Sequence, residues 1–414
     1  MANASPQAAA SNANCSGCTH ERRLDFFFRF DSDSDGATKL TMSTTPATKQ
    51  KTFDDVSSGK DLVGKLAGND TKTDHKDWSK EFAGWSDTAI AAHGGAVTNP
   101  EGLVIAMFET LEEQALARAQ GNQATGPDGE ALPVYVTADG LDLKQLIQKF
   151  LLMAITFHQG TDDYLDGDVD GKGLLASNAP GDDAYTPLEH AWDEGFGYFG
   201  AARDYLAYTD DEIAAKGGRD GWQGYYDTDG DGSIDLKSEF NFGASVNAAK
   251  RDRAGGTDFT ADAMNAFLTG RAIIAAAGDS LTSDQMAALE VQRDAAVAAW
   301  EKALAATVVH YINECIVHID AFGTPDHSFV DYAKHWSELK GFALGFQFNP
   351  RSPLGSTAFG EFHAKVGDKP VSPKADAADI AAYRKALLEA RTLLGDAYEF
   401  DTALLGDDSG QGGW

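Results

Sequence analysis

Histidine and carboxylate residues recur at helical spacing in several parts of this 414-residue sequence. The segment Thr186–Gly200 carries His190, Asp193 and Glu194 among bulky aromatic residues. His190 and Glu194 are four residues apart, so they lie on one face of a helix. Imidazole and carboxylate groups are costly to bury beside aromatic rings unless they bind a ligand or each other. The segment is therefore the first candidate for a binding site.

Two later segments carry the same residue types. Glu314 and His318 are four residues apart, His335 and Glu338 are three apart, and a helical wheel places His310 farther from the core than His318. Inward-facing His and Glu residues from several helices build the metal sites of helical bundles. Ordinary contacts on a helix surface, or a buried network that determines core register, are the alternative. The predicted transition-metal ligands come from His190, Asp193, Glu194, Glu314, His318, His335 and Glu338.

Three loops repeat the pattern D-x-D-x-D-G, in which alternating carboxylates surround one centre and the glycine allows a sharp turn. The third copy resembles an EF-hand loop, although Ser238 stands at the closing position and the acid follows one residue later. The alternative is a solvated acidic turn. We predict Ca²⁺ ligands at Asp227, Asp229, Asp231, Ser233, Asp235 and Glu239, and further candidates, which lack later ligands, at Asp166, Asp168 and Asp170 and at Asp31, Asp33 and Asp35.

Helical periodicity dominates the sequence, and strand signals are scarce. The clearest pattern begins with a capping box at Thr282 and Gln285 and continues with apolar residues spaced by three and four. The predicted fold is an all-α helical bundle of two sub-bundles, with long Asp/Gly-rich loops and a short extended N-terminal arm. Predicted helices span 58–67, 99–120, 140–158, 187–207, 260–277, 283–320, 328–347 and 376–396.

The predicted domain organisation follows from this pattern. Residues 1–24 should be a disordered tail, 25–400 the helical-bundle domain and 401–414 a flexible C-terminal tail. The aromatic motif is echoed by a later His-Trp segment, which is consistent with half-bundles at about 25–210 and 258–400.

Composition narrows the classes of partner. A net charge of −30 argues against nucleic acid and anionic membranes as direct partners. No apolar run is long enough to predict a transmembrane segment. The N-terminus lacks the features of an intact signal peptide and resembles the polar stretch that follows a removed one. Cys15 and Cys18 favour a local disulfide over zinc, whereas Cys315 is expected in the core.

The motif Glu189–Gly200, read E-H-A-W-D-E-G-F-G-Y-F-G, resembles an uncharacterised family of secreted bacterial helical lipoproteins, known as a domain of unknown function. Leu141–Gln145 and His335–Pro350 fit the same pattern, so the resemblance covers most of the chain. It implies an extracytoplasmic location, in the periplasm or at the cell surface, and a lipid anchor on a native precursor, although no lipobox surrounds Cys15.

The sequence is also similar, more distantly, to the imelysin proteins, which are extracytoplasmic helical bundles linked to iron uptake. Some of them are described as peptidases. Their G-x-H-x-x-E mark is matched in part, because Asp193 follows His190 at the expected spacing and Glu194 comes one residue later. This resemblance implies iron or another transition metal as the cofactor.

Three functions follow from these observations. The leading hypothesis is an extracytoplasmic, non-enzymatic binding protein of an iron-acquisition system, with calcium-stabilised loops. Its partners would be a metal ion or metal complex and an outer-membrane or surface protein. One alternative is a metal-dependent hydrolase or peptidase that uses the His190/Glu194 helix, with Glu194 as base. The other is a calcium-stabilised surface interaction or structural protein. No nucleophile with a positioned base is present, so we assign no catalytic residue.

Overall fold

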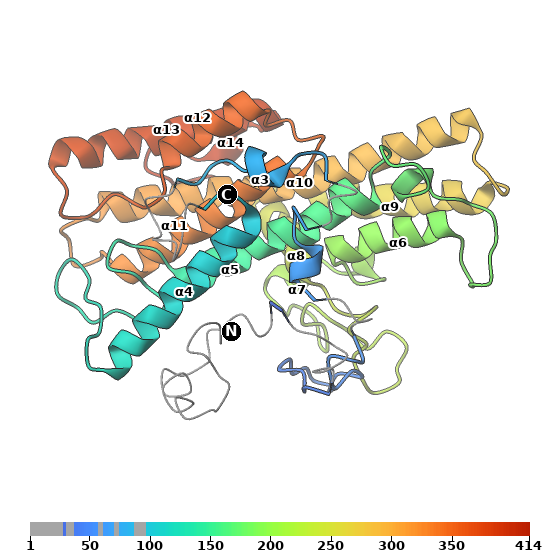
Figure 1. The fold of residues 1–414 in the computed structure, drawn as a ribbon, viewed down its shortest axis with the longest axis horizontal. Coiled ribbons are helices and arrows are strands. Elements are labelled where there is room, and N and C mark those ends of the chain that lie inside the picture. The colour runs from blue at the N-terminus through green and yellow to red at the C-terminus, as the bar shows by residue number, and fades with distance from the viewer. Residues whose placement is uncertain (1–27, 30–36, 57–60, 70–73, 87–96) are drawn as a thin grey trace.

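The computed structural model describes residues 28–29, 37–56, 61–69, 74–86 and 97–414. Within these ranges the chain forms twelve α-helices with short 3-10 and π-helical segments, and no β-strand. The predicted all-α helical bundle is therefore confirmed. Most of the long helices run lengthwise through the molecule, and long loops project from its ends and lower edge (Figure 1).

The helices are numbered in chain order from the first one described. They are α3 (Trp78–Glu81), α4 (Pro100–Ala119), α5 (Leu143–Leu151), α6 (Pro187–Phe199), α7 (Asp210–Ala214), α8 (Gly243–Asp252), α9 (Phe259–Ala276), α10 (Ser283–Asp320), α11 (Phe329–Ala343), α12 (Ser356–Val366), α13 (Ala377–Tyr398) and α14 (Thr402–Leu405).

Helix α10 is the 38-residue central element, and its bounds coincide with the predicted helix at 283–320. The predicted capping box is confirmed. The Thr282 hydroxyl accepts from the Gln285 amide, and the Gln285 side chain accepts from the Thr282 amide. These bonds satisfy backbone N–H groups that the first turn leaves without a helical partner. Helix α10 then packs against α8, α9, α11 and α13, so it connects most of the bundle.

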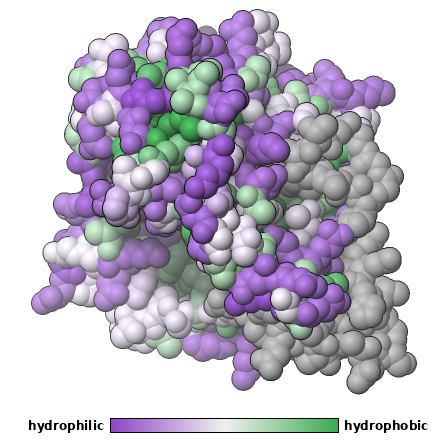
Figure 2. Space-filling view, turned by 90° about the vertical axis from the view of Figure 1, so that its left-hand side faces the viewer, coloured by the Kyte–Doolittle hydropathy of each residue, from purple (hydrophilic) through white to green (hydrophobic). Residues whose placement is uncertain are grey.

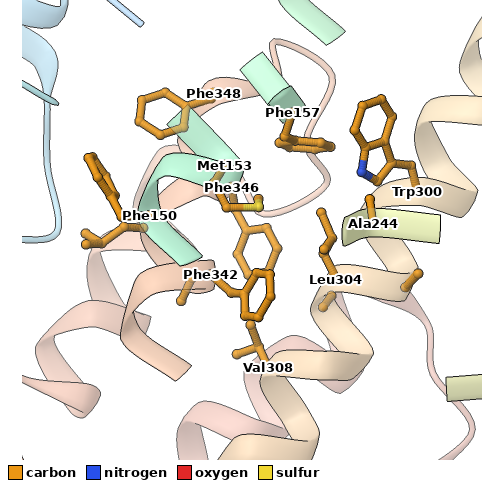
Figure 3. Close-up of a cluster of buried hydrophobic side chains, with 14 of the residues drawn as sticks. Phe150, Met153, Phe157, Ala244, Trp300, Leu304, Val308, Phe342, Phe346 and Phe348 are labelled. Atoms are coloured by element: carbon orange, nitrogen blue, oxygen red, sulfur yellow. The ribbon is translucent and has the colours of Figure 1, made fainter. Parts of the chain in front are cut away.

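The core lies along α10. Figure 3 shows Trp300, Leu304 and Val308 of this helix facing aromatic side chains that include Phe157 and Phe342. Most buried apolar side chains of the described chain belong to one continuous cluster, which draws on both predicted half-bundles. Each such side chain contributes about 1.5–3 kcal/mol when it is removed from water. The predicted core position of Cys315 is confirmed, because its side chain is fully buried in this cluster.

Helix α5 does not end where a regular helix would. It continues into two π-helical segments, Leu152–Phe157 and Gln159–Tyr164, which meet at His158. A Cβ at Gly160 would lie 2.6 Å from Cζ3 of Trp300, so only glycine allows this segment to approach α10 so closely. π-Helical turns are uncommon and often occur at functional sites.

Several predicted boundaries differ from the structure. The helix predicted at 187–207 ends at Phe199, because Gly200 adopts a left-handed conformation with φ 79°. Helix α8 lies inside the predicted loop 209–258, where glycine and aspartate surround a short alanine-rich stretch. Helix α12 was also not predicted.

The C-terminal segment, predicted as a flexible tail over 401–414, packs on the bundle. Trp414 is 7% exposed and contacts the ring of Phe400. The Asn313 side-chain amide on α10 donates to the carbonyl of Leu405. Burial of the terminal aromatic ring supplies the packing energy that the polar composition of this segment did not predict.

The N-terminal arm, described from residue 37, is extended but forms no strand, and it contacts the third Asp-rich loop. Thr48 pairs with Ile234 in an isolated parallel bridge, and the Lys49 amide donates to the Ile234 carbonyl at 2.8 Å. The predictions for the tail 1–24, for Cys15 and Cys18 and for Asp31, Asp33 and Asp35 lie outside the described residues.

Hydrophilic residues cover much of the face shown in Figure 2, with scattered apolar patches between them. Among the described residues, no helix combines the length and the apolar character that crossing a bilayer requires.

Candidate metal centre

Three of the predicted transition-metal ligands meet where α10 and α11 pack together. Nε2 of His318 lies 3.0 Å from Nδ1 of His335, and that Nδ1 lies 3.6 Å from Oε2 of Glu314. One ligand atom from each residue lies within 4.8 Å of the other two. The two helices therefore place two imidazoles and one carboxylate around a common point.

The surroundings of this α10–α11 cluster keep the imidazoles neutral. Burial, assisted by the charge of Lys334, lowers the pKa of His335 to about 4, and burial also lowers the pKa of His318. Burial raises the pKa of Glu314. The Tyr311 ring stacks against His335, with centroids 6.0 Å apart. Neutral imidazoles keep a lone pair for a metal ion near neutral pH.

The geometry of the cluster suits a divalent transition metal. Metal–ligand bonds of about 2.0–2.1 Å place neighbouring ligand atoms roughly 3–3.5 Å apart, close to the separations observed here. Two imidazoles and one carboxylate are a typical ligand set for Fe(II) with open positions, and Zn²⁺ accepts the same donors. With no metal bound, one imidazole N–H can donate to the other ring, so the cluster is also a stable polar contact.

Glu338 lies one turn beyond His335 but does not join these ligands. Its Oε1 is 3.3 Å from Nζ of Lys149 on α5, and its carboxylate also accepts a hydrogen bond from Tyr311. Glu338 is therefore part of a buried ion pair between α11 and α5.

The α6 residues are not brought to this cluster. Nε2 of His190 lies 3.0 Å from Oε1 of Glu194, and the two side chains are 48% and 35% exposed. Asp193 forms an ion pair with Arg271 of α9 at 3.0 Å. Figure 1 places α6 and α11 toward opposite ends of the bundle. The aromatic residues of the motif attach α6 to the core instead, and Trp192 donates its indole N–H to the Phe267 carbonyl.

The third Asp-rich loop brings part of its predicted ligand set together. Asp227, Asp229 and Glu239 each offer an oxygen within 4.8 Å of the others. Glu239 is buried and accepts from the amides of Thr228 and Asp235, so the acid after the closing position holds the loop shut.

The other predicted oxygens of this loop have different partners. Ser233 donates to Asp231, and Asp235 accepts from the Gln50 side chain at 2.8 Å. Lys49 of the N-terminal arm lies 3.5 Å from Asp231. These groups are therefore arranged as loop and arm contacts, and they do not belong to the three-residue group.

The second Asp-rich loop is organised differently. Oδ1 of Asp166 lies 2.9 Å from the Arg351 guanidinium, and its Oδ2 accepts from the Asp168 amide. Within the described chain, Asp166, Asp168 and Asp170 do not gather as a three-residue ligand group. Arg351 supplies the positive charge that we had assigned to calcium.

Sequence analysis missed a further group, formed by Asp74, His158 and Asp162. The spacing of four between His158 and Asp162 is a visible signal for one helix face. Asp74 precedes α3 and is distant in sequence, so no local pattern connects it to the other two.

Comparison with known proteins identifies the family. Residues 41–354 match the family described as Domain of unknown function (DUF4856). No curated protein and no solved structure matches the chain. The matched range includes the third Asp-rich loop, the aromatic motif of α6 and the α10–α11 cluster. Since the match covers more than half of the sequence, this chain belongs to the DUF4856 family.

Proposed function

We propose that this protein is a non-enzymatic binding protein for a divalent transition metal, with iron as the first candidate. The observation that carries the proposal is the meeting of Glu314, His318 and His335 from two helices, with the imidazole nitrogens 3.0 Å apart. The two-histidine, one-carboxylate set favours Fe(II) among the metals that such donors accept.

Exchangeable binding is supported by the position of the cluster. The side chains of His335 and Glu314 are partly exposed, so an ion can reach them without unfolding of the core. The net charge of −30 raises the local concentration of cations around the molecule.

We further propose that the protein works outside the cytoplasm in metal acquisition, with a lipid anchor on its native precursor. A metal ion or metal complex and an outer-membrane or surface protein would be its partners. The distant similarity to imelysin proteins supports the link to iron.

Calcium in the third Asp-rich loop is the second part of the proposal. The oxygens of Asp227, Asp229 and Glu239 face one another, and oxygen donors are the ligands that Ca²⁺ prefers. Its role would be to stiffen the loop on which the N-terminal arm rests, which also supports the alternative of a surface interaction protein.

A hydrolase centred on α6 has weaker support. His190 and Glu194 form an exposed pair on one helix, and Asp193 is engaged by Arg271. A catalytic metal needs about three protein ligands and an open position.

The test is anaerobic Fe²⁺ titration of the calcium-loaded protein, followed by calorimetry. We expect the double variant His318→Gln/His335→Gln to lose binding by at least about tenfold, because each lost ligand typically costs more than about 1.4 kcal/mol. His190→Gln is the matched control and should bind like the wild type. Equal Fe²⁺ affinity in the wild type and the double variant would refute the proposal, and loss of binding in His190→Gln would favour the α6 hydrolase.

A further inference from the structure

The group formed by Asp74, His158 and Asp162 lies inside the fold, between the segment that leads into α3 and the π-helical continuation of α5. Nε2 of His158 is 3.0 Å from Oδ1 of Asp74, and its Nδ1 is 3.5 Å from Oδ2 of Asp162. The side chains of His158 and Asp162 are 0% exposed and that of Asp74 is 4% exposed. Two carboxylates and one imidazole thus share a dry interior.

Backbone and side-chain donors hold one oxygen of each carboxylate. Oδ2 of Asp74 accepts from the Gly68 amide at 3.0 Å. Oδ2 of Asp162 accepts from the amide of His75 at 3.2 Å and faces its ring Nδ1 at 2.8 Å. Such outer contacts orient a carboxylate and leave its second oxygen available, as they do around metal ligands.

The second oxygens and the imidazole are without hydrogen bonds. Within the described chain, Oδ1 of Asp74, Oδ1 of Asp162 and both ring nitrogens of His158 make none. The 3.0 Å approach of His158 to Asp74 therefore lacks the direction of a hydrogen bond, although it is short. Buried polar groups in this state are destabilising unless a partner is supplied, and charged ones more so.

A divalent cation supplies that partner to all three residues at once. Metal bonds of about 2.0–2.2 Å separate neighbouring ligand atoms by roughly 3–3.5 Å, which matches the distance between His158 and Asp74. Two carboxylate charges match the charge of the ion, so the buried group becomes neutral.

Aromatic rings close the group off from water. Phe348 lies edge-on to His158, with centroids 6.1 Å apart, and Trp78 of α3 packs against both Phe348 and His75. The π-helical turns on either side of His158 are a backbone irregularity of the kind that recurs at functional sites. Burial on this scale suits a structural ion rather than one that exchanges rapidly.

We propose that Asp74, His158 and Asp162 form a structural site for one divalent first-row metal ion, with Zn²⁺ as the reference ion. The ion ties the segment before α3 to the π-helical part of the core. This site is separate from the α10–α11 cluster and does not depend on the function proposed for it.

The test begins with the full-length His318→Gln/His335→Gln variant, in which the α10–α11 ligands are absent. The protein is purified with Zn²⁺ present and without chelator, freed of loosely bound metal, and analysed for zinc per chain. We expect about one equivalent to remain. Adding Asp74→Asn should remove it and lower the melting temperature by several degrees. Asp326→Asn, at an exposed loop position, is the matched control and should retain the zinc.

Two results would overturn the proposal. One is absence of retained zinc in the starting variant, and the other is an unchanged equivalent in the Asp74→Asn protein. If Asp74→Asn does not fold, Co²⁺ is titrated into the starting variant. Saturation at one equivalent with visible bands of nitrogen and oxygen coordination supports the site, whereas an unchanged aqueous Co²⁺ spectrum overturns it.

Discussion

The histidine at the α10–α11 cluster should make the metal-free protein sensitive to mild acid. Burial lowers the pKa of His335 from 6.5 to about 4, so the unfolded chain binds a proton more tightly than the folded one. Protonation therefore favours unfolding. The stability that this residue supports is complete above pH 6.5 and is lost as the pH falls toward 4.

The size of the effect follows from those two values. Between about pH 7.5 and about pH 5, His335 alone should reduce the free energy of unfolding by about 2 kcal/mol. An exposed histidine with an ordinary pKa in both states would contribute nothing over the same interval. The neighbouring His318 shifts in the same direction, so it adds to the acid sensitivity of the wild type.

The measurement is urea unfolding across this pH range for wild type and His335→Gln, both in chelator to remove metal. Glutamine at this position costs a constant amount for lost packing, so the informative quantity is the change with pH of the difference between the two proteins. We expect the difference to shrink by about 2 kcal/mol on acidification, because only the wild type loses stability through this residue. His190→Gln is the matched control. A difference that is the same at both pH values would refute the assigned burial of His335.

Two further predictions concern packing and calcium. Gly195→Ala should destabilise the protein by about 1–3 kcal/mol, because the added Cβ would lie 2.7 Å from Cγ of the buried Leu165. Gly197→Ala in the same helix meets open space and should be neutral or stabilising by up to about 1 kcal/mol in thermal unfolding; equal effects of the two would contradict the placement of α6. Calcium removal should lower the melting temperature of the wild type, whereas Glu239→Gln should melt at nearly the same temperature with and without calcium. An unchanged melting temperature in excess chelator would remove the calcium site.

Local signals predicted the helices well where caps and periodicity agree. The capping box at Thr282 and the regular apolar spacing after it specified α10, since both depend on residues within a few positions of each other. The bounds of α6 were less well predicted, because Gly200 ends the helix through its left-handed backbone conformation. In α8, an alanine-rich stretch becomes helical on contact with α7, α9 and α10.

The polar clusters show the limit of spacing as evidence. The same interval of four separates His190 from Glu194 and Glu314 from His318, yet the first pair is exposed and the second meets His335. In α6 the inward positions are taken by aromatic residues such as Trp192, which leave the histidine to solvent. Spacing identifies residues on a common face, and it does not identify what that face contacts.

The sequence alone determined the fold class, the position of the longest helix, the acidic character and the residue types available to hold cations. Those properties depend on composition and on interactions between near neighbours. The tertiary structure decided which ligands meet: it joined His335 to Glu314 and His318, paired Asp166 with Arg351, and brought Asp74 to His158. The reason is that helix periodicity is a local property, whereas the contacts of a helix face depend on how all the helices pack around a shared core.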